Sequence, residues 1–148
     1  MEPLVGLADL VLFDLKTTDE EQHRRYTGVP LDQVLKNAQG VTATGKPIWI
    51  RTPIIPGYTD GEENIRRIAR LVRALPTVQR YDLLAFNNTC VGKYRRLGRS
   101  FPLSNEELVS EEKMNRLADV AASEGLGFVH WSGMTRRPAA TPVIDSIG

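Results

Sequence analysis

The sequence alternates between two apolar patterns, and this alternation constrains the fold more than any other feature. Short segments rich in β-branched and aromatic residues predict strands, while apolar residues at helical spacing lie between them. Strands separated by helices require right-handed crossovers, which produce a parallel sheet with helices packed on it. The predicted strands are residues 10–13, 48–55, 78–86 and 127–131.

Capping signals and glycine stops predict the helix ends. Thr18 with Glu21, and Asp60 with Glu63, have the spacing of capping pairs at helix N-termini. A polar connection without predicted structure spans residues 87–105. The predicted helices are residues 18–26, 31–44, 60–75 and 111–124.

Composition places the chain among single-domain proteins. Its 148 residues, 41% of them hydrophobic, can bury one core. A net charge of +1 gives no general attraction to nucleic acid or to anionic membranes, and no apolar run approaches the ~20 residues of a membrane span. The N-terminal segment lacks a signal-peptide pattern, and a single cysteine cannot form an internal disulfide. We therefore expect a cytoplasmic protein.

Polar residues follow three of the predicted strands. Asp14 and Lys16 end the first strand and, two positions apart, project to the same side. Arg51 lies late in the second strand, and Asn87 follows the third. An open doubly wound sheet and part of a barrel both remain possible, but no Gly-rich phosphate loop follows the first strand. A ligand site at the shared rim explains these residues together, and a mutual ion pair of Asp14 and Lys16 is the simpler alternative.

Four stretches are informative in their order and spacing: FDLK, HRRYTGV, WIRTPIIPGYTD and LLAFNNTCVGKYRRLG. Together they resemble the C-terminal half of the glycyl-radical-enzyme activating enzymes. These are radical S-adenosylmethionine proteins typified by pyruvate formate-lyase activating enzyme. The resemblance covers about residues 8–103 and implies half of a partial TIM-type (β/α) barrel, with parallel strands and alternating helices. We expect residues 1–135 to form this part of the barrel domain and 136–148 to be a loosely ordered tail.

The resemblance also implies roles for individual residues. Asp14, Lys16 and Arg51 match positions that contact S-adenosylmethionine in the family. Asn87 stands where the typical member has a histidine, so it can form hydrogen bonds there but cannot titrate near neutral pH. The family's monovalent cation would be held partly by the backbone carbonyl of Leu12.

The family binds its [4Fe–4S] cluster through a CxxxCxxC motif, which this sequence lacks. Its one cysteine, Cys90, lies in a predicted loop. We therefore expect the chain to be part of a longer enzyme, to hold no cluster by itself and to be inactive alone. The partners implied are a glycyl radical enzyme as protein substrate and an electron donor such as flavodoxin or ferredoxin, with no nucleic acid or membrane.

Two other functions remain open. The chain could come from a radical S-adenosylmethionine enzyme acting on a small molecule or peptide, or it could be a non-catalytic half-barrel binding domain. A half barrel has unpaired sheet edges and an uncovered concave face, on which we expect Leu10, Leu12, Trp49 and Leu83. Self-association of the isolated chain is therefore expected.

Overall fold

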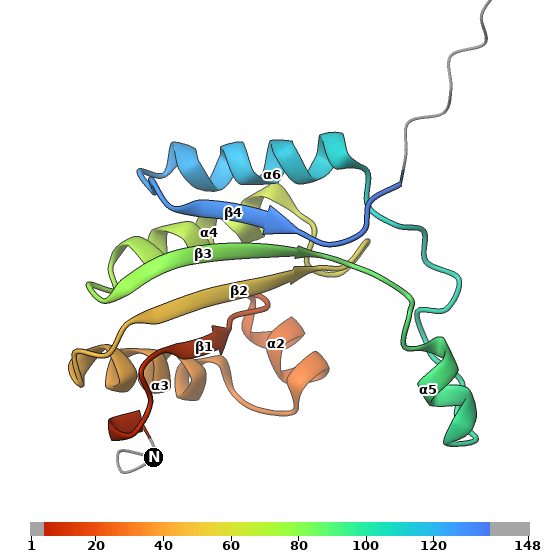
Figure 1. Ribbon diagram of the computed structural model, residues 1–148, viewed down its shortest axis with the longest axis horizontal. Coiled ribbons are helices and arrows are strands. Elements are labelled where there is room, and N and C mark those ends of the chain that lie inside the picture. Colours follow the sequence, from red (N-terminus) through yellow and green to blue (C-terminus); the bar gives the residue numbers. More distant parts are fainter. Residues whose placement is uncertain (1–4, 137–148) are drawn as a thin grey trace, which may run out of the picture.

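A computed structural model describes residues 5–136, in which four parallel strands form one sheet in the order β1-β2-β3-β4 (Figure 1). The predicted α/β class with parallel strands and alternating helices is confirmed. The predicted tail lies, apart from Arg136, outside the described residues. The strands are Val11–Asp14 (β1), Ile48–Ile54 (β2), Val78–Ala85 (β3) and Val129–Ser132 (β4).

Helices fill each connection between the strands. Two follow β1, one lies between β2 and β3, and two lie between β3 and β4. The short α5 was not predicted, because its sequence VGKYRR carries no helical apolar stripe. None of the helices within residues 5–136 is long and apolar enough to cross a membrane. The helices are Glu20–Thr27 (α2), Leu31–Ala43 (α3), Glu62–Arg73 (α4), Val91–Arg96 (α5) and Glu111–Ser123 (α6).

Both predicted capping pairs were wrong by one residue. Asp19, not Thr18, caps α2, because its Oδ1 accepts a hydrogen bond from Gln22 N at 2.8 Å. Gly61 is the N-cap of α4 and offers no side-chain cap. Asp60 instead accepts a hydrogen bond from the Gly57 amide at 2.9 Å, across the turn that leads into the helix. The Asp60 side chain, which was expected to cap α4, therefore stabilises the preceding turn instead.

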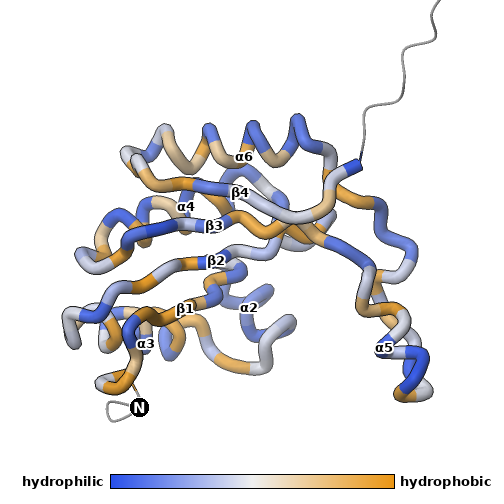
Figure 2. Tube along the Cα trace, viewed as in Figure 1, coloured by the Kyte–Doolittle hydropathy of each residue, from blue (hydrophilic) through white to orange (hydrophobic). Residues whose placement is uncertain are grey.

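The apolar core lies between the sheet and the helices. Alternate β2 residues are buried against this side, and Figure 2 shows orange stretches interrupted by blue and white ones along the strands. Leu83 also belongs to this side and is fully buried, so its predicted place on the open face was wrong. Its register partner is Thr52, a core-facing residue, whereas Trp49 belongs to the other face. The core includes Ile48, Ile50, Ile54, Ile65, Ile68, Val72, Tyr81, Met114 and Leu117.

A buried polar contact joins the end of β1 to the sheet. The Thr52 hydroxyl donates a hydrogen bond to Leu15 O at 2.7 Å and lies 3.1 Å from the Tyr81 hydroxyl. All three residues are almost completely buried, and burial raises the pKa of Tyr81 well above its usual range, so the phenol stays protonated. The carbonyl just beyond β1 is therefore satisfied inside the core rather than left without a partner.

Glu124, directly after α6, joins this helix to α4. Its carboxylate accepts hydrogen bonds from Arg66 NH1 at 2.9 Å and from Arg70 Nε at 2.8 Å. Arg73 NH1 donates to the backbone carbonyl of the same glutamate at 3.1 Å. The bond from Arg70, and then that from Arg66, holds the pKa of the Glu124 carboxyl below its usual value. Three arginines of α4 thus contact the residue that follows α6.

The Glu124 contacts predict a pH-dependent contribution to stability. A carboxyl whose pKa is lowered by folding stabilises the protein above its unfolded pKa, and this stabilisation is lost as the pH falls through the folded value. Glu124→Gln should therefore lower the melting temperature at pH 7, and the difference from wild type should shrink steadily below about pH 4. Thermal unfolding by circular dichroism from pH 3 to 7 measures it. Glu63→Gln, at the solvent-exposed Arg67 pair, is the control and should change little.

Candidate functional site

The predicted site residues Asp14 and Arg51 are in contact at the C-terminal edge of the sheet. The two residues are register partners in β1 and β2. Arg51 Nε and NH2 each lie 2.8 Å from Asp14 Oδ1, and both side chains remain more than a third exposed. Within the described residues, Lys16 makes no ion pair, so the simpler alternative of an Asp14–Lys16 pair was wrong. The aspartate is paired across strands because parallel register aligns it with an arginine.

Lys16 lies in the loop after β1, where hydrogen bonds from side chains replace the backbone hydrogen bonds between strands. Leu15 still donates its amide to Arg51 O at 2.9 Å, but the next residues leave the sheet. Thr17 is buried, and Asn64 from α4 donates a hydrogen bond to Lys16 O at 3.2 Å. The half-buried Lys16 thus follows Asp14 on a loop whose backbone is anchored on both sides.

Asn87 lies two residues beyond β3 on the same edge, since Phe86 still donates its amide to Ile54 O at 3.1 Å. Its exposed side chain forms a turn of its own, in which Oδ1 accepts a hydrogen bond from Thr89 N at 3.2 Å. No hydrogen bond or ion pair in the described part of the chain joins Asn87 to Asp14 or Arg51. The side-chain oxygen is thus engaged in its own loop, and Nδ2 is the group of this side chain that can donate hydrogen bonds.

Charged residues continue from this site across the open face of the sheet. Register aligns Asp14, Arg51, Asp82 and His130 in one row over the four strands. The nearly buried Asp82 accepts a hydrogen bond from Arg80 Nε at 2.7 Å. The sequence analysis missed this row, although the two-residue spacing of the acid and the arginine in β3 is the signal that places them on one face.

Trp49 in β2 contacts Arg80, the partner of Asp82 in this row. Its ring lies 4.7 Å from the guanidinium carbon of Arg80, within the range of a cation–π contact. As predicted, Trp49 and the half-exposed Leu12 lie on the open face, where the two are register partners. The open face therefore combines apolar surface with fixed charges rather than being uniformly apolar.

The Leu12 carbonyl faces away from β2. Val11 and Leu15 both donate their amides to the neighbouring β2 segment, and in a parallel pair every second residue uses its backbone groups in this way. Leu12 alternates with them at the outer edge of the sheet. The Leu12 carbonyl therefore lies at the outer edge of β1, two residues before Asp14.

The groups at the rim fit S-adenosylmethionine but not an iron–sulfur cluster. A carboxylate, a guanidinium and an ammonium can pair with the charged and hydroxyl groups of that molecule. Cluster binding needs several thiolates, and residues 5–136 contain no group of three His, Cys, Asp or Glu placed to hold a metal ion. Cys90, a half-buried residue directly before α5, is alone.

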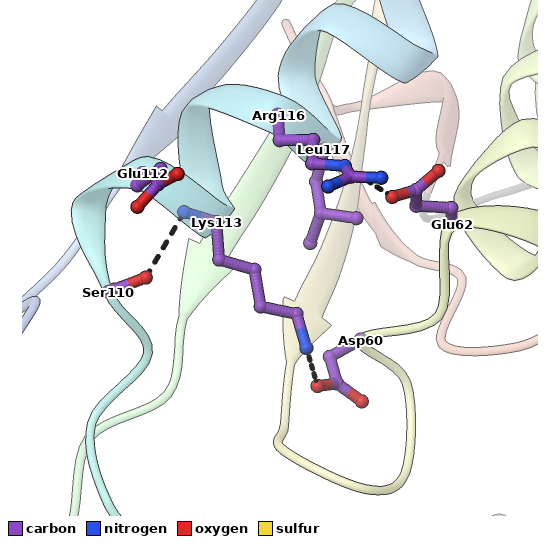
Figure 3. A pocket seen from close by; sticks show the side chains of 7 residues that line it. All are labelled: Asp60, Glu62, Ser110, Glu112, Lys113, Arg116 and Leu117. Atoms are coloured by element: carbon purple, nitrogen blue, oxygen red, sulfur yellow. Dashed lines mark hydrogen bonds and ion pairs between the residues drawn. The ribbon is translucent and has the colours of Figure 1, made fainter.

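A separate cavity of about 570 Å³ lies between the N-terminal ends of α4 and α6 (Figure 3). Lys113 reaches across it to the Asp60 carboxylate, and Arg116 pairs with Glu62. Ser110 Oγ accepts a hydrogen bond from the Lys113 amide at 3.2 Å and caps α6. The lysine and the arginine that line this cavity are thus each paired with a carboxylate.

Comparison of the sequence with known proteins identifies relatives named pyruvate formate-lyase-activating enzyme. No family model matches the chain. The pyruvate formate-lyase-activating enzyme of Streptococcus mutans is 36% identical over 102 residues, which cover 69% of this chain and 39% of that enzyme. The enzyme of the same name from Staphylococcus epidermidis is 29% identical over 125 residues, covering 84% of this chain and 47% of the enzyme. The chain is a relative of the pyruvate formate-lyase-activating enzymes.

Solved structures agree with this relationship at the level of the fold. A domain of pyruvate-formate lyase-activating enzyme from Bacteroides vulgatus superposes with a TM-score of 0.70 at 24% identity, covering 89% of this chain and 72% of that domain. A radical SAM methyltransferase from Sphaerobacter thermophilus gives a TM-score of 0.62 at 18% identity, covering 89% of this chain and 38% of the methyltransferase. The predicted resemblance and fold are thus confirmed. The chain spans less than half the length of the activating enzymes that it matches in sequence.

The Arg80–Asp82 pair predicts an asymmetry between two substitutions in this activating-enzyme relative. Arg80→Met leaves the nearly buried Asp82 carboxylate without its partner and should lower the free energy of unfolding by about 1–3 kcal/mol. Asp82→Asn keeps an acceptor for Arg80 and should cost less. Urea unfolding measures both, with Arg67→Met in an exposed pair as the control. A larger loss for Asp82→Asn would contradict this assignment.

Proposed function

We propose that this chain is the C-terminal part of a radical S-adenosylmethionine activating enzyme that generates a glycyl radical on a partner glycyl radical enzyme, pyruvate formate-lyase or a related lyase or dehydratase. The observation that supports it is the exposed Asp14–Arg51 pair followed by Lys16, at the rim of a sheet related in sequence to pyruvate formate-lyase-activating enzymes. With a [4Fe–4S] cluster, bound S-adenosylmethionine supplies, by reductive cleavage, the radical that abstracts hydrogen from the glycine.

The residues of this chain bind and orient the cofactor. Asp14 accepts hydrogen bonds from its ammonium or from a ribose hydroxyl, while Lys16 and Arg51 donate to carboxylate or ribose oxygens. Arg51 already contacts Asp14 through Nε and NH2, so the aspartate also holds the guanidinium in place for the ligand. Asn87 donates from Nδ2, and a monovalent cation near the cofactor carboxylate takes the Leu12 carbonyl as one ligand.

The other components of the reaction come from outside the described residues. The cluster is held by cysteines that this sequence does not contain, so the chain alone is inactive. An electron donor such as flavodoxin or ferredoxin reduces the cluster, and the glycyl radical enzyme is the protein substrate. A reducing cytoplasm suits this chemistry, because iron–sulfur clusters depend on reduced thiolates.

Three substitutions test the cofactor site. Asp14→Ala, Lys16→Ala and Arg51→Ala each remove a charge-assisted contact worth ~1.5–3 kcal/mol, which is roughly a ten- to hundred-fold loss of S-adenosylmethionine affinity. Binding is measured by NMR titration of the chain, because chemical shifts also report weak affinities. Lys36→Ala on α3, which removes an exposed lysine paired with Asp32, is the control for Lys16→Ala.

The pattern of losses distinguishes a site from scattered surface charges. Asp14 and Arg51 contact each other, so their double substitution should lose less affinity than the sum of the single ones. Amide shifts caused by the ligand should include Lys16, Arg51 and Asn87. Normal binding by all three folded variants would refute the cofactor assignment.

We also propose that the isolated chain self-associates through its open face or the edge at β1. The Leu12 side chain is 50% exposed there, and an unpaired strand edge invites pairing with another chain. Light scattering over a concentration series should detect a dimer. Leu12→Lys should give a monomer, whereas Leu97→Lys, at the 72%-exposed leucine beside α5, should leave the dimer intact. A wild-type monomer at high concentration would exclude this proposal.

A further inference from the structure

The side chain of Asn64 connects the two loops that follow β1 and β2. Its Nδ2 donates hydrogen bonds to Lys16 O and to Thr59 O, both at 3.2 Å. Its Oδ1 accepts a hydrogen bond from Thr18 N at 3.1 Å. The amide thus uses three of its four hydrogen-bonding positions, all with backbone groups. This pattern fixes the orientation of the side chain, because exchanging its oxygen and nitrogen would lose both bonds to carbonyls.

The loop after β2 gives Asn64 a rigid base. Thr59 is buried, its hydroxyl accepts a hydrogen bond from Ile55 N at 2.8 Å, and the same hydroxyl donates to Pro53 O. Thr59 is therefore fixed to the end of β2, in the strand that carries Arg51. Through its bonds to Thr59 O and Lys16 O, Asn64 connects the loop after β1 to the end of β2.

The loop after β1 depends on these bonds because it has left the sheet. Asp19 N bonds to Thr17 Oγ1, and Leu15 keeps its bonds to β2. Between them, the Lys16 carbonyl and the Thr18 amide have the Asn64 side chain as their partner among the described residues. Both backbone groups that flank Thr17 are thus held by one side chain from a helix more than forty residues away.

We propose that Asn64 is a positioning residue that fixes Lys16 for binding S-adenosylmethionine. The inference rests on the proposed cofactor role of Lys16, and it assigns to Asn64 the task of holding the backbone from which that side chain extends. Asn64 then keeps Lys16 at a fixed position relative to the Asp14–Arg51 pair, because it connects the loop after β1 to the loop after β2. A lysine side chain has many rotamers, so fixing its backbone reduces the entropy lost on binding.

Two variants and a matched control test this role. Asn64→Ala removes all three bonds, and Asn64→Asp keeps the acceptor for Thr18 N while placing a carboxylate against two carbonyl oxygens. Asn37→Ala on α3 is the control, since Asn37 is also helical and half-buried but bonds only to Gln33 one turn away. Both alanine variants remove an asparagine side chain from a helix, but only Asn64→Ala removes hydrogen bonds to two loops.

Hydrogen exchange measured by NMR reports the loop directly. In Asn64→Ala, the Thr18 amide should exchange at least about tenfold faster, whereas Asn37→Ala should leave it unchanged. Asn64→Asp should keep the slow exchange of Thr18 and still weaken S-adenosylmethionine binding about tenfold, because the Lys16 side of the anchor is lost. An unchanged Thr18 exchange rate in folded Asn64→Ala would overturn the proposal.

A double-mutant cycle separates positioning from a general structural role. If Asn64 acts through Lys16, Asn64→Ala should cost almost no further affinity in a Lys16→Ala background. Additive losses would overturn the proposal, because they would show that Asn64 affects binding by another route. A wild-type chain whose spectrum does not respond to S-adenosylmethionine would refute the cofactor assignment, and Thr18 exchange would then decide by itself whether Asn64 holds the loop.

Discussion

The parallel pairing of β1, β2 and β3 is the constraint on which the rest of the structure depends. It places Asp14 beside Arg51 and Arg51 beside Asp82, so charges of opposite sign alternate across neighbouring strands. A slip by one residue would turn every side chain of a strand to the other face and would bury these charges under the helices. The Thr52 hydroxyl opposes such a slip, because its bond to Leu15 O is buried and fits one register only.

The two faces of the sheet differ in polarity and in what they contribute to the protein. The helix-covered face is apolar and provides most of the stabilisation, with Ile50, Leu83 and Met114 completely buried. The open face carries pairs of opposite charge, Asp14 with Arg51 and Asp82 with Arg80, and Arg80 also lies over the Trp49 ring. Since the pairs already exist without ligand, a charged molecule meets a partly ordered surface and little further ordering of side chains is needed.

Beyond the strand ends, hydrogen bonds from side chains hold the backbone in place of the bonds between strands. Thr52, Thr59 and Asn64 hold the loops after β1 and β2 through bonds to backbone groups. These contacts explain how a lysine outside the sheet can have a defined position relative to an arginine inside it. The loop after β3 has another kind of order, because Asn87 makes its turn with Thr89 and an aromatic contact between Tyr94 and Phe101 packs α5 against its own connection. Figure 1 shows α5 projecting away from the sheet.

The sequence by itself determined the α/β class, the strand and helix order and the edge at which Asp14, Lys16, Arg51 and Asn87 lie. These features follow from local periodicity and from the rule that parallel strands end on one side. Only the tertiary structure decided that Arg51, 37 positions away, is the partner of Asp14, and that Leu83 faces the helices. Register and long-range hydrogen bonds set these choices, and they depend on distances between segments that no local pattern contains.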